Sequence, residues 1–166
     1  HIGNTPPKIE EVLELLGKGD IATHCYNNKV NGLVREGKVI PEVREAINRG
    51  VLFDVGHGSE SFSLDTAAEG IEEGFEADII STDIYSKNII TPVGSLENTM
   101  NKMMYLGWSV EKCVEKVTNV PAEALKLKGL GELKEGYMGD LTIFDIVENG
   151  KLELKDSVNK VITAEK

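Results

Sequence analysis

The chain has 166 residues, which is enough for one domain with a substantial core, or for one domain and part of another. Its 28 acidic and 18 basic residues give a net charge of −10, which argues against nucleic acid or an anionic membrane as a partner. No stretch approaches the length of apolar sequence that a membrane span needs, and the two distant cysteines, Cys25 and Cys113, are expected to be reduced thiols of a cytoplasmic protein.

Short apolar runs alternate with amphipathic stretches, which is typical of an α/β protein with parallel strands. Proline near the start of a helix and glycine just after its end mark several of the boundaries, for example Pro41 and Gly50. In chain order we predict a helix over 7–16, a strand over 20–27, a polar connection over 28–39, a helix over 41–50, a strand and its loop over 51–59, a helix over 63–75, a strand over 77–85, and helices over 94–107, 109–118 and 120–127.

The last part of the chain has a different character. Gly129, Gly131 and Gly136 cluster in a short stretch, and the sequence after them is strand-like. We therefore predict two domains, an alternating α/β part over 1–128 and strands of a small β domain over 129–166.

The predicted strands end near Gly3, Thr23, Val55 and Thr82, about one βα unit apart each time. Four successive units fit half of a (β/α)8 barrel or a four-stranded piece of a doubly wound sheet. No GxGxxG or Walker loop follows the first strand, which disfavours a nucleotide-binding sheet.

Residues capable of metal binding or acid–base chemistry stand at these strand ends. His1, His24 and Asp83 end or directly follow three of the strands, and His57 lies two residues after Val55. The carboxyl ends of parallel barrel strands face one shared mouth, so these groups can surround a single ion. Imidazole nitrogen and carboxylate oxygen suit zinc and similar divalent ions.

Each of these residues also has a plain structural explanation. His1 alone reads as a chain end, His24 as a half-buried core histidine, His57 as a loop residue between glycines, and Asp83 as a cap after a strand. Four polar side chains at equivalent places are harder to explain in this way. Their joint placement is what indicates a site.

The segments HIG, THCYN, FDVGHGS and STDIY resemble the C-terminal half of the amidohydrolase superfamily, in particular its dihydroorotase-like and adenine deaminase-like deacetylase subgroup. The later run VTNVPAEALKLKGLGELKEGYMGDLTIFD is similar to the closing signature of that superfamily. The resemblance covers nearly the whole chain. It implies strands five to eight of a (β/α)8 TIM barrel, followed by part of a small β-sandwich domain.

The resemblance also implies site residues. His1 corresponds to the fifth-strand metal ligand, His24 to the sixth-strand ligand, and Asp83 to the eighth-strand aspartate, which is both a ligand and the general base. One or two divalent ions, with zinc expected, would be completed by an His-x-His and a bridging carboxylated lysine. Neither motif precedes His1, so both are expected in an N-terminal half of the barrel outside this sequence.

The implied activity is metal-dependent hydrolysis of an amide or ester, with deacetylation of an N-acyl or O-acyl acid expected first. We expect a small-molecule substrate to meet the loops 27–39, 56–61 and 85–92, with Gly56, His57 and Tyr85 as binding residues, or with His57 shaping its loop. Ring opening by a cyclic amidase, deamination of a nucleobase, and a metal-free scaffold paralogue remain alternatives. A homo-oligomer is expected.

Overall fold

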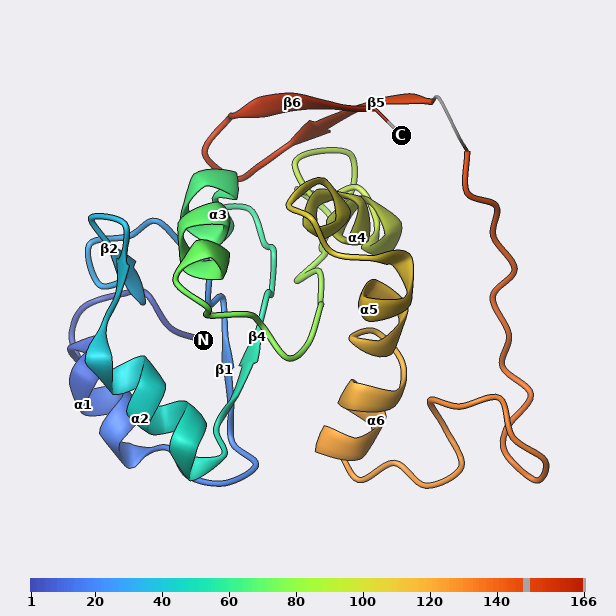
Figure 1. Cartoon of the computed structure of the whole chain (residues 1–166). Coiled ribbons are helices and arrows are strands. Elements are labelled where there is room, and N and C mark those ends of the chain that lie inside the picture. The colour runs from blue at the N-terminus through green and yellow to red at the C-terminus, as the bar shows by residue number, and fades with distance from the viewer. Residues whose placement is uncertain (148–149, 166) are drawn as a thin grey trace.

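The computed structural model describes residues 1–147 and 150–165, and its regular elements follow the predicted order (Figure 1). The elements are α1 (Ile9–Leu15), β1 (Ile21–Thr23), β2 (Val34–Arg35), β3 (Lys38–Val39), α2 (Pro41–Arg49), β4 (Leu52–Asp54), α3 (Leu64–Glu72), α4 (Leu96–Tyr105), α5 (Val110–Glu115), α6 (Asn119–Ala124), β5 (Lys151–Lys155) and β6 (Val161–Glu165).

Four extended segments lie side by side in the order in which they occur along the chain. The amide of Ile2 donates to the carbonyl of Thr23, and β1 pairs with β4 in parallel, with Thr23 opposite Asp54. The next segment bridges β4 in parallel at Ile79. Helices connect these segments, as expected for consecutive βα units of a partial barrel.

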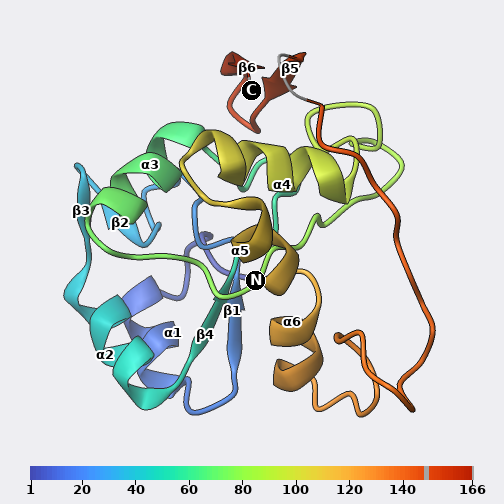
Figure 2. The same ribbon diagram turned by 45° about the vertical axis from the view of Figure 1, so that its right-hand side comes forward.

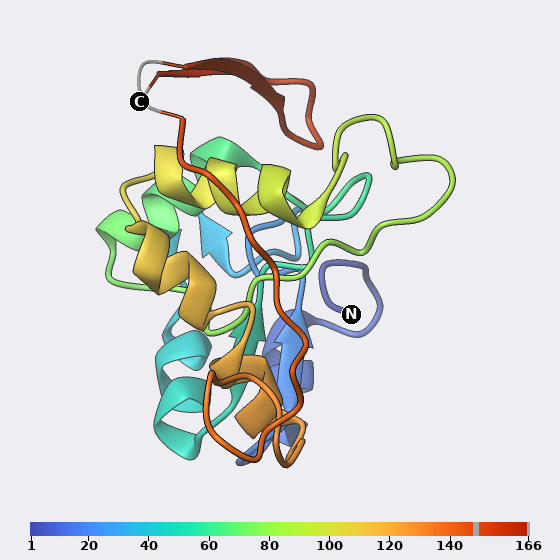
Figure 3. The same ribbon diagram turned by 90° about the vertical axis from the view of Figure 1, so that its right-hand side faces the viewer.

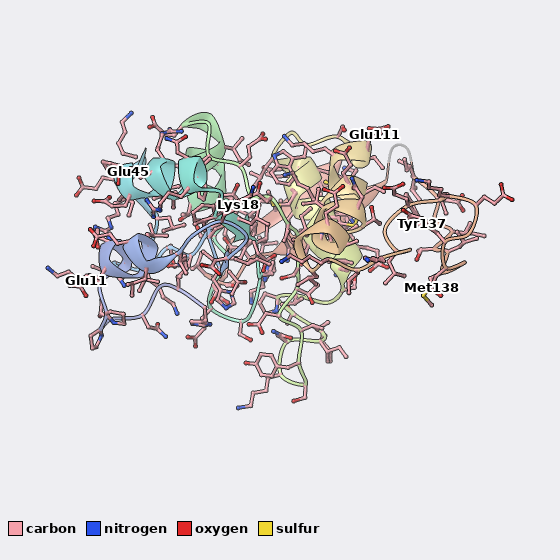
Figure 4. All side chains as sticks on the ribbon, turned by 90° about the horizontal axis from the view of Figure 1, so that it is seen from below. Glu11, Lys18, Glu45, Glu111, Tyr137 and Met138 are labelled. Carbon is pink, nitrogen blue, oxygen red and sulfur yellow. The ribbon has the colours of Figure 1, made fainter. Side chains whose placement is uncertain are left out.

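The helix ends follow the sequence signals. Gly50 ends α2 in the left-handed conformation at φ 85°, which a residue without a side chain adopts at little cost. The hydroxyl of Ser63 accepts the amide of Thr66 at the start of α3. Figure 4 shows Glu11 and Glu45 on the outward sides of α1 and α2, where water solvates their charge.

The strands bury one face against the helices. Ala22 and Phe53 stand opposite each other in the register of β1 and β4, and both are fully buried in the hydrophobic core. Their neighbours Ile21 and Leu52 point to the other face, since side chains alternate along a strand, and they are only partly covered. That second face corresponds to the interior of the barrel.

The connection predicted as polar over 28–39 contains a short hairpin that the sequence analysis missed. β2 and β3 pair antiparallel around Glu36 and Gly37, both of which have positive φ, at 50° and 74°. This is the backbone of a tight two-residue hairpin turn. Two-residue strands are too short to produce a detectable alternation.

The C-terminal part contains one antiparallel hairpin, β5–β6, which lies above α3 and α4 in Figure 1 and crosses over α4 in Figure 3. The prediction of strand structure is confirmed for this hairpin and is wrong for residues 141–147, which form no strand. Leu141, Ile143 and Phe144 in that segment are largely exposed. Their apolar side chains find no cover in the described part of the chain, so the segment has nothing to pair with.

Within residues 1–147 and 150–165, no helix has the length and apolar character that crossing a membrane requires. Cys25 and Cys113 are both buried and neither forms a disulfide.

Candidate metal centre

His24 follows β1 directly, and its ring is fixed by one hydrogen bond. Its Nδ1 lies 2.5 Å from the carbonyl oxygen of Gly56. A carbonyl can only accept, so Nδ1 carries a proton, and in the neutral ring Nε2 is then the nitrogen with the free lone pair. A histidine held in this way presents Nε2 to a metal ion, which is the usual arrangement of an imidazole ligand.

His1 lies against His24. The two ring centroids are 4.3 Å apart with their planes at 75°, so the fifth and sixth strand positions bring two imidazoles together. His24 is buried, at 3% exposure, whereas His1 is exposed. The donor set, two nitrogens with one tautomer fixed, fits a divalent transition metal such as zinc.

Among the residues that the structure describes, five non-glycine residues have positive φ, and two of them are His24, at 73°, and Asp83, at 46°. Left-handed backbone is costly for residues that carry a Cβ and often occurs at functional sites. Here it occurs at the residue that follows β1 and at the residue that follows the hydrogen-bonded segment 79–82.

A glycine-containing segment, Val55–Gly58, lies between these two residues. It continues the parallel pairing, because His57 donates its amide to the carbonyl of Ser81 and Gly58 donates to that of Thr82. The carbonyl of Gly56 holds His24, and a Cβ placed on Gly58 would lie 2.8 Å from Oδ2 of Asp83. The segment therefore touches both candidate ligands.

Asp83 is exposed, and its own backbone is tied down by the fully buried Asn88. The side chain of Asn88 donates to the carbonyl of Asp83 at 3.0 Å and accepts the amide of Tyr85 at 2.7 Å. The hydroxyl of Ser59 donates to that of Tyr85 at 2.9 Å. This contact joins the loops that follow β4 and Asp83. The second of these loops projects away from the helices in Figure 3, on the side of the N-terminus.

His57 is fully buried and its ring faces inward. It stacks on Phe62 with 4.7 Å between centroids, and its Nδ1 donates to the carbonyl of Gly58 at 2.9 Å. Its Nε2 accepts from the ammonium of Lys102 at 2.8 Å. Burial, together with the positive charge of Lys102, lowers the pKa of His57 to about 3, so the ring is neutral near pH 7.

Lys102 is a functional candidate that the sequence analysis missed. It lies on α4 with no exposed surface, and burial lowers its pKa to about 8, an effect opposed by the charge of Asp156. Its ammonium also donates to the carbonyl of Pro92 at 2.7 Å. The sequence carries a signal for it, because Lys102 falls between Thr99 and Met103 on the buried face of the helix.

Asp54 is a second residue that was missed. Its Oδ2 accepts from the hydroxyls of Thr23 at 2.6 Å and Ser81 at 2.7 Å, which ties three neighbouring extended segments together. Its Oδ1 is buried and has no hydrogen-bond partner among the described residues. A lone acid at the end of the apolar run VLFD was the sequence signal.

The structure thus pairs His1 with His24, and places Gly56 behind His24 and Gly58 beside Asp83. Among the described residues, no group of three or more His, Cys, Asp or Glu side chains is arranged to hold a metal ion. The side chain of His57 points towards Lys102 of α4, and the hydroxyl of Tyr85 contacts Ser59 in the neighbouring loop. The roles assigned from sequence to all of these residues stay predictions, the ligand roles of His1 and His24 included.

Residues 20–164 match the sequence pattern of the Amidohydrolase family. A protein named deacetylase from Enterococcus faecalis is 44% identical over 149 residues, which is 88% of this chain and 40% of that protein. A deacetylase from Brucella anthropi is 38% identical, over 95% of this chain and 39% of its own length.

Two solved structures are similar over 99% of this chain and 45% of theirs. One is described as an adenine deaminase, with a TM-score of 0.95 and 41% identity, and the other as a dihydroorotase, with a TM-score of 0.90 and 34% identity. The chain therefore spans less than half the length of the proteins it matches, as expected of a partial barrel. With its strand order, its paired histidines and these similarities, the chain belongs to the amidohydrolase family.

Proposed function

We propose that the chain supplies strands five to eight of a metal-dependent hydrolase that removes an acetyl group from an N-acyl or O-acyl acid. The observation that carries the proposal is the setting of His24. Its Nδ1 is tied to the carbonyl of Gly56, its backbone is left-handed, and its ring lies against that of His1. The two curated relatives reported above are both named deacetylase, and these names support this choice of reaction.

We propose that His1 and His24 hold a divalent ion, with zinc as the first candidate, through ring nitrogens, and that Asp83 contributes a carboxylate oxygen. The remaining ligands, an His-x-His and a carboxylated lysine, would come from strands one to four, and their number decides between one ion and two. When bound, such an ion lowers the pKa of a water molecule and polarises the scissile carbonyl.

We assign two steps to Asp83. Its exposed carboxylate accepts a proton from the attacking water and later returns it to the leaving group. The left-handed backbone at Asp83 and the hydrogen bond from Asn88 to its carbonyl fix the backbone position from which the carboxylate projects. Gly58, which has no side chain, leaves room for it.

Tyr85 is proposed to contact the substrate from the loop after Asp83, because it is half-exposed and its hydroxyl meets Ser59 across the mouth. His57 has no exposed surface, which favours the role of shaping its loop over the role of contacting substrate. Gly56 is proposed to support His24 through its carbonyl.

The complete active unit, in this proposal, joins this half to strands one to four, and completes a small β-sandwich domain over residues 129–166 with strands from elsewhere. We place it in the cytoplasm, in keeping with two cysteines that form no disulfide, and expect it to form a homo-oligomer.

A second candidate function is ring chemistry, either a cyclic amidase or a nucleobase deaminase. The solved structures described as a dihydroorotase and an adenine deaminase favour it. The same ligands serve both chemistries, so the loops around Tyr85 and Ser59 decide the substrate. A metal-free scaffold is the non-enzymatic alternative.

The test uses the complete protein, with its metal content measured by elemental analysis and its activity measured on acetylated acids, cyclic amides and adenine. Asp83→Asn is expected to lower kcat per bound metal by about 10²- to 10⁴-fold, because the proton acceptor is lost. Asp140→Asn, in an exposed segment, is the control and should leave kcat unchanged. Near-normal turnover by metal-loaded Asp83→Asn would remove the assigned role, and a protein without bound metal would favour the scaffold.

A further inference from the structure

The turn between β5 and β6 reaches across the fold to the segment beside Asp83. The hydroxyl of Ser157 lies 2.9 Å from the carbonyl oxygen of Gly58 and 3.4 Å from that of His57. These residues are about a hundred positions apart in the sequence. Figure 2 shows the hairpin at the top of the molecule, over α3 and α4.

The turn is fixed at several further points. The backbone amide of Ser157 donates to the carbonyl of Phe62 at 3.0 Å. The buried carboxylate of Asp156 accepts the amide of Leu64 at 3.0 Å, at the start of α3, where a negative charge is favourable. Leu154 and Ile162 are buried in the main hydrophobic core. The hairpin is therefore packed on the barrel half, and Ser157 has a defined position.

The same segment is also held by α4. The ammonium of Lys102 donates to Nε2 of His57 and to the carbonyl of Pro92, which ends the loop that begins at Asp83. Ser157 holds the backbone carbonyls of the His57–Gly58 segment, and Lys102 holds its side chain. Gly58 accepts the hydrogen bond from Ser157, and its α-carbon faces the Asp83 carboxylate.

We propose that Ser157, in the C-terminal hairpin, is a positioning residue that sets the His57–Gly58 segment against the Asp83 carboxylate, with Lys102 fixing the His57 side chain of the same segment. The small β part thereby contributes to the reaction without contacting substrate. This inference rests on the role proposed for Asp83, and its structural half does not depend on that role.

The test compares three variants of the complete protein. Ser157→Ala removes the hydroxyl, Ser157→Thr keeps it, and Lys160→Gln removes an exposed ion pair between the same turn and Asp65, with no contact to the segment. Hydrogen exchange of the His57 and Gly58 amides is measured together with kcat, KM and metal content. Because Ser157 is only partly buried, folding of the variants is expected and is checked by their metal content.

Ser157→Ala should speed exchange of the His57 and Gly58 amides by roughly 2- to 10-fold and lower kcat by a similar factor, with KM and metal content little changed. Ser157→Thr should restore both values, and Lys160→Gln should change neither. Unchanged exchange in Ser157→Ala, or an equal change in Lys160→Gln, would overturn the proposal. If the parent protein hydrolyses none of the substrates, the proposed function fails, and the exchange rates still decide whether Ser157 holds the segment.

Discussion

Glycine at positions 56 and 58 allows a backbone segment to pass between two candidate ligands. Gly56 has φ 46°, and a Cβ built there would lie 2.2 Å from Oγ1 of Thr23 and 2.9 Å from Nδ1 of His24. No side chain fits in that space, and the left-handed conformation would strain one in any case. The glycine thus lets its carbonyl approach the imidazole closely enough to fix the tautomer.

Gly56→Ala is therefore expected to displace His24 and weaken metal binding by about 10- to 100-fold, the usual effect of disturbing a group that orients a ligand. Gly37→Ala is a matched control, because Gly37 also has positive φ, 74°, but a Cβ there meets nothing within 4 Å. Both variants carry the backbone cost, and only the first carries the clash. Metal titration of the two complete proteins measures the difference, and equal affinities would show that Gly56 does not set the position of His24.

Among single residues, the sequence predicts the position of those that stand at the end of a strand. His24 and Asp83 could be predicted because a parallel strand delivers its last residue to a known edge. Lys102 and Ser157 could not, since their importance depends on partners 45 and about a hundred residues away. Spacing within α4 indicates that Lys102 is buried, but it carries no record of the distant residues that contact it.

Helix α4 contributes a buried positive charge to the loop after β4. Lys102 can be accommodated because its ammonium has two acceptors, Nε2 of His57 and the carbonyl of Pro92, and because Asp156 lies near enough to favour its charged form. Burial, together with this charge, lowers the pKa of His57 and keeps its ring neutral near pH 7. The packing of α4 on this loop should therefore depend on pH.

The sign follows from the pKa of His57, about 3 when folded against about 6.5 when unfolded. The unfolded chain takes up the proton first, so stability is fully present above pH 6.5 and is lost as pH falls towards 3. Between pH 7 and 5 the loss from this group is on the order of 2 kcal/mol. Lys102 is charged in the folded and the unfolded chain between pH 7 and 5, so it does not contribute to the pH dependence of stability in this range.

Chemical unfolding of the complete protein at pH 7 and pH 5 measures this loss. His57→Gln, which cannot titrate, should lose less stability between the two pH values than the parent does. Lys102→Met should also reduce the loss, because removing the ammonium raises the pKa of His57 towards its usual value. The same pH dependence in all three proteins would show that His57 is not the group responsible.

Helices and strands could be predicted where they are long enough to show a regular spacing of apolar residues. The helices from α2 to α4 have an apolar face and a capping residue, and their predicted ends lie within three residues of the observed ones. Residues 141–147 carry a strand pattern without a strand, since pattern shows what a segment can bury and not whether a neighbour is present. In this chain Ile143 remains 95% exposed.

The whole molecule has the form of a barrel cut along its axis. Helices cover Ala22 and Phe53, while Ile21 and Leu52 on the opposite face remain partly exposed. Asp54 adds a buried oxygen with no partner among the described residues. Burying an unpaired polar atom is costly, so a donor from the other half is the expected completion of Asp54.

Half of a barrel should therefore behave differently alone and when joined to strands one to four. Residues 1–166 by themselves are expected to self-associate and bind a hydrophobic dye, because apolar strand surface and unpaired strand edges face water. Co-expression with the other half should give a monodisperse complex that excludes the dye. Light scattering and dye fluorescence measure both states.

One substitution sharpens the comparison. Ile21→Thr, on the inner face, should lower dye binding by the isolated chain yet weaken the joined protein, because the same side chain is a liability when uncovered and a core contact when covered. Glu11→Gln, on the outward side of α1, removes no apolar surface and should change neither. A cooperative, monomeric fold of the isolated chain that excludes the dye would mean that the inner face closes without strands one to four, and the half-barrel interpretation would then be wrong.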